Sequence, residues 1–382
     1  MTINTLAMTG TRRLLIAPSC VLLGPTALAK LTDMVAKVGN RVLIVQGEVA
    51  WKLAEQYVVA ALNATSLAFE TAFLGGEVTE AAIERLCIAA RGMDAIIGVG
   101  GGKVLDASKL IAQRLQLPAF TIPTSAATCA AWTALANLYT DNGAWLYGEL
   151  LDCPPQAVAL DCNLVATAPV RLLASGIADA MAKWYEAAST MDATRADAFT
   201  LAAGELAHHL HKQLVRHAKA AVSELRRQDS GEALRRVIEI NVLLAGAVGE
   251  MGGPACRSVA AHAVANGLTH LPGNRRSYHG EKVAFGILVQ LVLQDRPLGE
   301  IEELIDFFND IGLSPALNDL AVALSQNDLQ PAITVALQED SSIYALPIPI
   351  DEVMLSRAIS EVNGLLRTQL PVARPEIASR ID

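Results

Sequence analysis

The chain has 382 residues, of which 52% are apolar, 18% are charged and 4% are aromatic, and its net charge is −9. A single hydrophobic core stops growing at about 250–300 residues, so this length predicts two domains. The composition is that of a globular enzyme rather than a disordered chain. The negative charge and the lack of a long basic run argue against a nucleic-acid-binding function.

The cysteines and the apolar segments predict a reduced, cytoplasmic protein that does not enter a membrane. Residues 12–29 resemble a secretion signal, but Pro18 and Pro25 interrupt the apolar part, and a strand followed by a helix explains the same residues. The uncharged run 115–139 contains two prolines and several threonines and is a poor membrane span. No CxxC pair occurs among the six cysteines, Cys20, Cys87, Cys129, Cys153, Cys162 and Cys256.

The first half of the chain alternates strands with helices. Strand patterns lie at 41–45, 66–73, 94–99 and 118–123, and helical patterns lie at 49–62, 79–91 and 103–114. This alternation predicts a parallel, doubly wound sheet. From about residue 165 the periodicity is helical almost without a break. We therefore predict an α/β domain over 1–164 and an all-helical domain over 165–382.

Three glycines, 100–102, follow the strand pattern at 94–99. They would let a ligand approach the backbone closely, and the helix after them would offer free N–H groups to a diphosphate. A triple glycine can also be only a tight turn. Asp106 and Lys109 make the pattern more specific, because a carboxylate is unfavourable beside a phosphate unless it binds another group, such as a hydroxyl or an amide of the ligand.

The small, hydroxylated stretch from Thr124 to Thr133 follows the next strand pattern and would lie at the same edge of the sheet. It has two interpretations that the sequence leaves open. The stretch could line the floor of the same ligand site, or it could cap a following helix.

A helix–loop–helix pattern over Ser258–Gln290 carries His262 and His279 on either side of a Pro-Gly turn. One histidine on an apolar helix is usually a satisfied core residue, but two that flank a turn can point into one cleft. Asp179 lies in a small, apolar helical segment, where an unpaired carboxylate is costly. It needs a cation, which is either Lys183, one turn on, or a metal.

Four separated motifs carry a family resemblance across essentially the whole chain: GVGGGKVLDASK, IPTSAATC, RLLASGIADAMAKWYEA, and AAHAVANGL with HGEKVAFGILVQ. In order and spacing they resemble the glycerol dehydrogenase branch of the iron-containing alcohol dehydrogenase superfamily. The resemblance implies a dehydroquinate synthase-like architecture, in which a dinucleotide-binding domain and a helical domain hold a catalytic divalent metal between them. It also implies a homo-oligomer.

By this resemblance Asp179, His262 and His279 are the zinc ligands, and three ligands with an open position suit catalytic zinc. The iron-binding members usually have a further histidine where this chain has Lys183, which favours zinc over iron and leaves another divalent metal open. The resemblance implies NAD(P) binding at the diphosphate loop and helix and at positions lining the nicotinamide and ribose: Gly101, Gly102, Lys103, Asp106, Thr124, Ala127, Thr133, Leu135 and Tyr139.

The implied reaction is hydride transfer between a secondary alcohol carbon and C4 of the nicotinamide. The metal would polarise the substrate oxygen, and no protein residue is assigned as a general base.

Three departures from glycerol dehydrogenases bear on specificity. Cys129 replaces an aspartate that contacts the polyol, and Arg257 replaces a small residue and could grip a carboxylate with its two-pronged guanidinium group. Gly47 replaces an aspartate that would bind the adenosine ribose, so NADPH is less excluded. These features resemble the hydroxycarboxylate dehydrogenase subgroup, and we predict a small 2-oxo acid or 2-hydroxy acid as the substrate.

Three alternatives stay open. Glycerol dehydrogenase proper is the first. A lyase like dehydroquinate synthase would need several basic residues for a substrate phosphate, whereas the cleft motifs supply mainly Lys183 and Arg257. A non-enzymatic metal-binding role would leave the triple glycine unexplained. A further set of histidines, expected on a solvated helix face, comprises His208, His209, His211 and His217.

Overall fold

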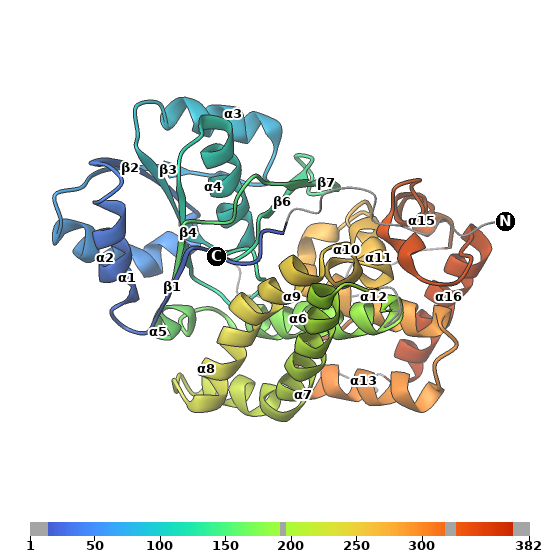
Figure 1. The fold of residues 1–382 in the computed structure, drawn as a ribbon. Helices are drawn as coiled ribbons and strands as arrows, with labels where there is room; N and C mark the ends of the chain where they lie inside the picture. Colours follow the sequence, from blue (N-terminus) through green and yellow to red (C-terminus); the bar gives the residue numbers. More distant parts are fainter. Residues whose placement is uncertain (1–13, 192–195, 318–325, 370–382) are drawn as a thin grey trace.

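A computed structural model of the chain describes residues 14–191, 196–317 and 326–369. The first 160 residues contain a six-stranded sheet with helices on both faces (Figure 1). All neighbouring strands are parallel, in the order β1 (Cys20–Leu23), β8 (Ala157–Leu160), β5 (Ala119–Pro123), β4 (Ala95–Gly100), β2 (Arg41–Gln46) and β3 (Ala68–Phe73). The predicted parallel, doubly wound sheet is confirmed.

Strand β2 is apolar from Val42 to Val45 because both of its faces are covered there. Val42 and Ile44 lie in one core with α1 (Ala27–Val35) and α2 (Glu48–Asn63). Leu43 and Val45 lie in a second core with α3 (Glu80–Ala89) and α4 (Gly102–Leu115). Since successive side chains of a strand point to opposite faces, a strand buried on both sides has a continuous apolar sequence.

The order of the strands reverses between β2 and β4. The chain passes outward from β2 to β3, returns to β4 on the other side of β2, and continues to β5. Where the order reverses, a crevice opens at the carboxyl edge of such a sheet. Gly47 follows β2 there and lies close to α4. A Cβ atom added to Gly47 would lie 3.2 Å from Cγ2 of Val104 in that helix.

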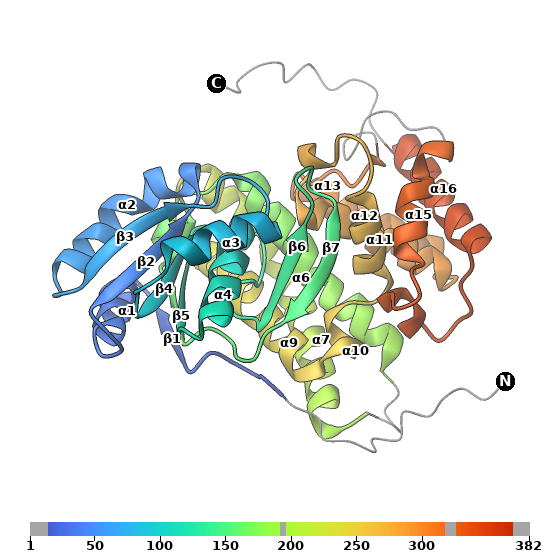
Figure 2. The ribbon, with the colours of Figure 1, turned by 90° about the horizontal axis from the view of Figure 1, so that it is seen from above.

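The segment after β5 departs from the expected alternation. Residues 124–134 are irregular and lead into the antiparallel hairpin of β6 (Leu135–Tyr139) and β7 (Trp145–Leu150). The interpretation of Thr124–Thr133 as a helix cap is therefore wrong. The hairpin itself was not predicted, and it lies between the parallel sheet and the helical part (Figure 2).

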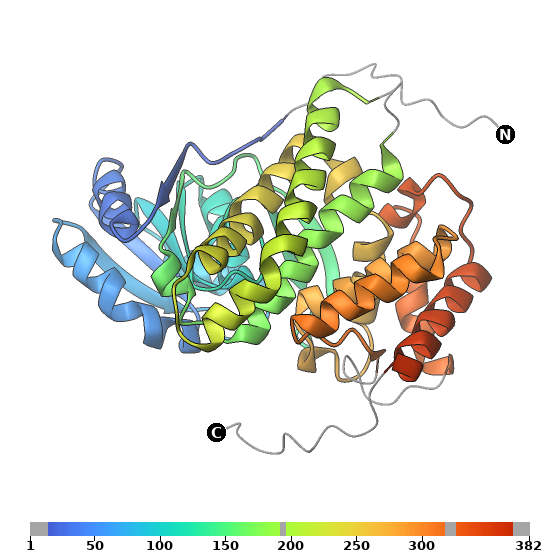
Figure 3. The ribbon, with the colours of Figure 1, turned by 90° about the horizontal axis from the view of Figure 1, so that it is seen from below.

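Beyond β8 the described residues form helices around one large apolar core, with α6 and α7 side by side (Figure 3). The elements are α5 (Cys162–Val165), α6 (Val170–Thr190), α7 (Ala198–Arg226), α8 (Glu232–Glu239), α9 (Ala245–Gly252), α10 (Pro254–Arg257), α11 (Ala260–Leu268), α12 (His279–Leu293), α13 (Leu298–Asp310), α15 (Gln330–Ala336) and α16 (Glu352–Gln369).

The change from strands to helices falls between Leu160 and Cys162. The domain boundary at 164/165 stays a prediction. None of the helices in the described ranges is long and apolar enough to cross a membrane. The start of the signal-like stretch, Arg12 and Arg13, and the end of the helical tail, 370–382, lie outside the described residues.

Candidate metal centre

Three helices bring Asp179, His262 and His279 together. Nε2 of His262 lies 3.2 Å and Nε2 of His279 lies 3.4 Å from Oδ1 of Asp179. All three donor atoms lie within 4.8 Å of one another. Tetrahedral zinc with bonds of about 2.0–2.1 Å separates neighbouring ligand atoms by about 3.4 Å. The two imidazoles and the carboxylate therefore fit a divalent ion, and a set of three leaves a position for a substrate atom.

Two glycines of α12 allow the helices to approach so closely. A Cβ atom on Gly280 would lie 1.8 Å from the carbonyl oxygen of Ser175 in α6. On Gly286 it would lie 2.1 Å from the carbonyl oxygen of Ala261 in α11. Because any side chain there would clash with main-chain atoms, α12 contacts both other helices backbone to backbone.

The start of α12, where His279 is the first residue, is held by an ion pair. The carboxylate of Glu281 accepts a hydrogen bond from the backbone N–H of Tyr278 at 2.7 Å and binds Nη2 of Arg171 at 2.8 Å. The same nitrogen of Arg171 donates to the carbonyl of Arg276 at 2.7 Å. These contacts link α6 to the loop before α12 and fix the direction in which His279 leaves the helix.

The sequence analysis missed Glu186, which is fully buried two turns after Asp179 on α6. Its Oε2 lies 2.7 Å from Nδ1 of His262. Burial raises the pKa of this carboxyl, but the charge and hydrogen bond of His262 outweigh it and hold the pKa below its ordinary value. A glutamate seven residues after a ligand on one helix face was the available signal.

Burial likewise opposes ionisation of Asp179, and hydrogen bonds from His262 and His279 outweigh it, so the pKa of Asp179 lies well below its ordinary range. The carboxylate is therefore charged at neutral pH. Lys183, which is 4% exposed, donates to the main-chain carbonyl of Arg257 at 2.8 Å. The described ion pairs of Asp179 are those with the two histidines rather than with Lys183.

The two predicted substrate residues differ in their surroundings. Burial and the nearby charge of Asp179 raise the pKa of Cys129 to about 11, against an opposing effect of Lys183, so the thiol is neutral. Arg257, whose side chain is 19% exposed, is paired through Nη2 with Oε2 of Glu250 at 3.1 Å. Glu250 also accepts from the backbone N–H of Ala134 at 3.0 Å. The guanidinium thus already has a carboxylate partner within the protein.

The glycine loop after β4 places the N-terminus of α4 at the crevice. Gly101 precedes the helix without a side-chain cap. A Cβ atom on Gly102 would lie 3.3 Å from Oγ1 of Thr128. The backbone N–H of Thr124 donates to the carbonyl of Gly100 at 3.1 Å, which joins this loop to the next one. Backbone N–H groups without a side-chain cap at a helix start can receive a diphosphate.

Two predicted cofactor residues bind protein groups. Asp106 accepts from the backbone N–H of Asn137 at 3.1 Å and pairs with Lys109 at 2.9 Å. The protein thus supplies partners for Asp106, and its assignment to the cofactor stays a prediction. Lys103 is bound to Glu77 at 2.7 Å. The remaining positions lie along the loop after β5 and on β6: Thr124, Ala127, Thr133, Leu135 and Tyr139.

The expectation of a solvated histidine face is wrong for two of its members. The ring of His208 stacks on Trp184 with centroids 4.4 Å apart, and His211 meets Tyr185 edge to face at 5.5 Å. Burial and the proximity of His208 lower the pKa of His211 to about 4, so this ring is uncharged at neutral pH. The cluster is half-buried against α6.

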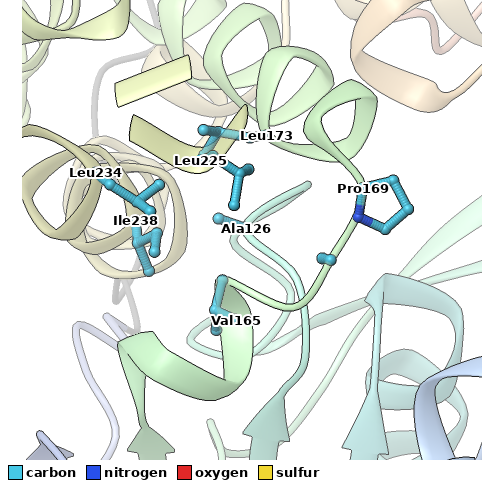
Figure 4. A pocket seen from close by; sticks show the side chains of 8 residues that line it. Ala126, Val165, Pro169, Leu173, Leu225, Leu234 and Ile238 are labelled. Atoms are coloured by element: carbon cyan, nitrogen blue, oxygen red, sulfur yellow. The ribbon is translucent and has the colours of Figure 1, made fainter. Parts of the chain in front are cut away.

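A small pocket lies where the α/β part meets α6, α7 and α8. Ala126, Val165, Leu173 and Ile238 are among the side chains that converge on it (Figure 4). Its lining is apolar and includes none of the metal-centre residues. It therefore offers no polar group to orient a substrate, and the candidate active site is the metal centre and the neighbouring crevice.

Comparisons with known proteins agree with this geometry. Residues 18–161 match the iron-containing alcohol dehydrogenase family. The glycerol dehydrogenase of Pseudomonas putida is 36% identical over 87% of this chain and 89% of its own. Hydroxycarboxylate dehydrogenase A of Escherichia coli is 36% identical over 70% of this chain and 75% of its own. The structure of glycerol dehydrogenase from Schizosaccharomyces pombe aligns with a TM-score of 0.84 and 28% identity, over 94% of this chain and 92% of that one.

A parallel nucleotide-binding sheet, a glycine loop at its reversal point and an adjoining site for a divalent ion define a metal-dependent dehydrogenase. The chain belongs to the iron-containing alcohol dehydrogenase family, in its glycerol dehydrogenase-like branch. The resemblance noted in the sequence is confirmed at this level.

Proposed function

We propose that the protein is a metal-dependent, NAD(P)-linked dehydrogenase that interconverts a small 2-hydroxy acid and the corresponding 2-oxo acid. The observation that supports this most is that the loop after β5 carries a free thiol, Cys129, packed against the helical core, and no carboxylate at that position. A carboxylate at this position would repel an anionic substrate, and a thiol with a raised pKa does not.

The charge of the centre also favours an anion. Two buried carboxylates, Asp179 and Glu186, are accompanied by one buried ammonium, Lys183. A divalent ion held by the three ligands leaves this group of charges positive by one unit. A positive, weakly solvated site attracts negative substrates and stabilises negative charge that develops on their oxygen.

In the proposed reaction Asp179, His262 and His279 hold a divalent ion, which we infer to be zinc because two imidazoles and a carboxylate suit it. When bound, the ion supplies Lewis-acid polarisation of the substrate oxygen. Gly101 and Gly102 would receive the diphosphate at the start of α4. The loop after β5 would hold the nicotinamide, whose C4 would supply or accept the hydride when the coenzyme is bound.

The coenzyme choice is proposed from Gly47, which follows β2 at the point where the strand order reverses. A carboxylate there would bind the ribose hydroxyls and repel a 2′-phosphate. Since glycine does neither, we propose that NADPH is accepted alongside NADH.

Glycerol or dihydroxyacetone is the second candidate, and the pairing of Arg257 with Glu250 favours it. A guanidinium that already binds a carboxylate of the protein is less able to bind one of the substrate. Two of the relatives described above are named glycerol dehydrogenases. The lyase alternative is weaker, since Lys183 and Lys109 both donate to main-chain carbonyls.

The test compares initial rates of NADPH and NADH oxidation by zinc-loaded protein with 2-oxo acids and with dihydroxyacetone. Two like charges about 4 Å apart at an effective dielectric constant of about 20 repel by about 4 kcal/mol. Cys129→Asp is therefore expected to slow the oxo acids more than tenfold and to spare dihydroxyacetone. Cys153→Ser, at an exposed position, is the matched control. Wild-type turnover confined to dihydroxyacetone would refute the oxo-acid proposal.

A further inference from the structure

We infer that Glu186 is a positioning residue that selects the tautomer of His262, keeping the proton on Nδ1 so that Nε2 stays free for the metal. The inference rests on the metal centre proposed above. It concerns a residue that makes no contact with the substrate, the coenzyme or the reacting atoms, and acts only through the imidazole.

Glu186 accepts three hydrogen bonds in a fully buried position. Its Oε1 accepts from the backbone N–H groups of Val259 at 2.7 Å and His262 at 3.0 Å. Its Oε2 accepts from Nδ1 of the His262 ring at 2.7 Å. The two backbone groups can only donate, which fixes Oε1 as an acceptor and leaves Oε2 to interact with the ring.

The His262 ring lies between two carboxylates that compete for its proton. Asp179 faces Nε2 at 3.2 Å, and Glu186 faces Nδ1 at 2.7 Å. A neutral imidazole carries one N–H, and the group bonded to one nitrogen decides which tautomer is present. Because Glu186 is the closer acceptor and its carboxylate cannot donate, it holds the proton on Nδ1. Without it, Asp179 would draw the proton to Nε2 and block the metal.

The Glu186 carboxylate also caps the start of α11. Its effect on the stability of this helix must therefore be separated from its effect on the tautomer of His262. Gln290 is the matched neighbour for this purpose. Its Oε1 accepts from the backbone N–H of Ala261 at 3.1 Å, and its Nε2 donates to the carbonyl of Tyr185 at 2.9 Å. Gln290 thus caps the same helix end from α12 and is fully buried. Within the described part of the chain, no hydrogen bond joins Gln290 to the His262 ring.

Glu186→Gln cannot satisfy all three donors, although it has nearly the same size. If the amide oxygen stays on the two backbone N–H groups, the NH₂ group faces Nδ1 and stabilises the wrong tautomer of His262. If the amide is flipped, the NH₂ group faces two backbone N–H groups instead. Glu186→Asp keeps a group that only accepts, on a shorter side chain. Tautomer selection therefore predicts that Asp is tolerated better than Gln, whereas size and cap geometry predict the reverse.

The experiment measures zinc affinity by competition with a chromophoric chelator, together with unfolding of the metal-free proteins, for the wild type, Glu186→Gln, Glu186→Asp and Gln290→Met. Loss of such a partner of a metal-ligating histidine costs about 10–100-fold in metal affinity. We expect a loss in this range for Glu186→Gln and a smaller one for Glu186→Asp. Gln290→Met should lower stability and change zinc affinity less than about threefold.

Equal zinc affinity of Glu186→Gln and the wild type would overturn the inference, as would an equal loss in Gln290→Met. If Glu186→Gln does not fold, Glu186→Asp decides: retained zinc binding supports the inference, and a loss as large as that of His262→Ala contradicts it. Failure of the wild type to bind zinc would overturn the metal centre as well, which separates the two claims.

Discussion

The proposed cofactor edge and the proposed metal centre are built in opposite ways. The cofactor edge uses main-chain groups of two adjacent loops, after β4 and after β5, and its glycines are consecutive in the sequence. The metal centre uses side chains from α6, α11 and α12, and its ligands span 100 residues, from Asp179 to His279. A local pattern can therefore reveal the first region. The second depends on helix contacts that allow no side chain at Gly280 and Gly286.

The largest expected effect comes from a substitution that changes only the proposed metal centre. Asp179→Asn removes the charged ligand that both imidazoles face. A catalytic metal supplies several kcal/mol, and about 4 kcal/mol corresponds to a rate factor of about 1000. We expect kcat/KM to fall by about that factor and zinc content to fall to background, measured by elemental analysis, with NAD(P)H binding retained.

Asp306→Asn, at an exposed position on α13, is the matched control. If Asp179→Asn lost coenzyme binding to the same extent as zinc, the two regions would not be independent, and the comparison would fail.

Cys129 lies between the two regions, on the loop after β5 and near Asp179, and its reactivity tests the electrostatics there. A pKa of about 11 in the metal-free protein, against an ordinary value of 9.0, leaves about 100-fold less thiolate at pH 8. We expect alkylation by iodoacetamide, followed by peptide mass spectrometry, to be about 100-fold slower at Cys129 than at a thiol of ordinary pKa.

The exposed Cys153 serves as the internal reference for this alkylation. Modification of Cys129 at the same rate as Cys153 would contradict the description of Cys129 as a half-buried thiol with a raised pKa.

Lys282, in the first turn of α12, gives a pH-dependent test of the same helix start. Burial lowers its pKa to about 8 from 10.5, with Lys103 and Arg171 acting in the same direction. Between these values the unfolded chain binds more protons than the folded one, so the stability contributed by Lys282 rises with pH and is lowest below pH 8. The unfolding free energy of the wild type minus that of Lys282→Met should increase by about 1–3 kcal/mol from about pH 7.5 to about pH 10, as measured by urea titrations.

A difference that stays constant or shrinks over this range would contradict the burial of a charged Lys282. Arg91→Met, which changes an exposed cation of the α/β part, should show no such trend.

The smallest expected effect isolates the cofactor edge. A Cβ atom on Gly101 would lie 3.5 Å from Oγ of Ser125, an ordinary contact, so Gly101→Ala should fold normally. The added methyl group would occupy space at the start of α4 that the diphosphate is proposed to use. We expect KM for NAD(P)H to rise about tenfold, which is about 1.4 kcal/mol, with zinc affinity unchanged.

Gly364→Ala, a position on α16 with nothing within 4 Å of the added atom, is the control for the loss of a glycine. An unchanged KM in Gly101→Ala would mean that the diphosphate does not approach this loop.

The sequence predicted β2, β4 and β5 because their apolar runs are buried on both faces and are separated by helical patterns. It did not predict β8, although that strand is equally buried. It did not predict the β6–β7 hairpin. The exposed Leu146, Tyr147 and Leu150 of β7 do not follow a strict alternation. The Asn142-Gly143 pair between the two strands is a hairpin turn signal that the sequence analysis did not use. The ligand set itself came from the family resemblance rather than from spacing.

Glu186 and the pairing of Arg257 with Glu250 could not be predicted in the same way. The seven-residue spacing from Asp179 places Glu186 on the same face of α6, but its role is recognisable only once α11 lies against α6, because its partners are the backbone and ring of His262. The orientation of Arg257 depends on the turn between α9 and α10. Such contacts depend on tertiary packing, which the periodicity of a single helix does not encode.

The central claim is that Asp179, His262 and His279 hold one divalent ion. The most direct measurement is anomalous diffraction at the zinc absorption edge from crystals of the zinc-loaded protein. The account predicts one strong peak within bonding distance of a carboxylate oxygen of Asp179 and of Nε2 of both histidines. A density map without a peak there, or with its main peak beside His208 and His211, would contradict it.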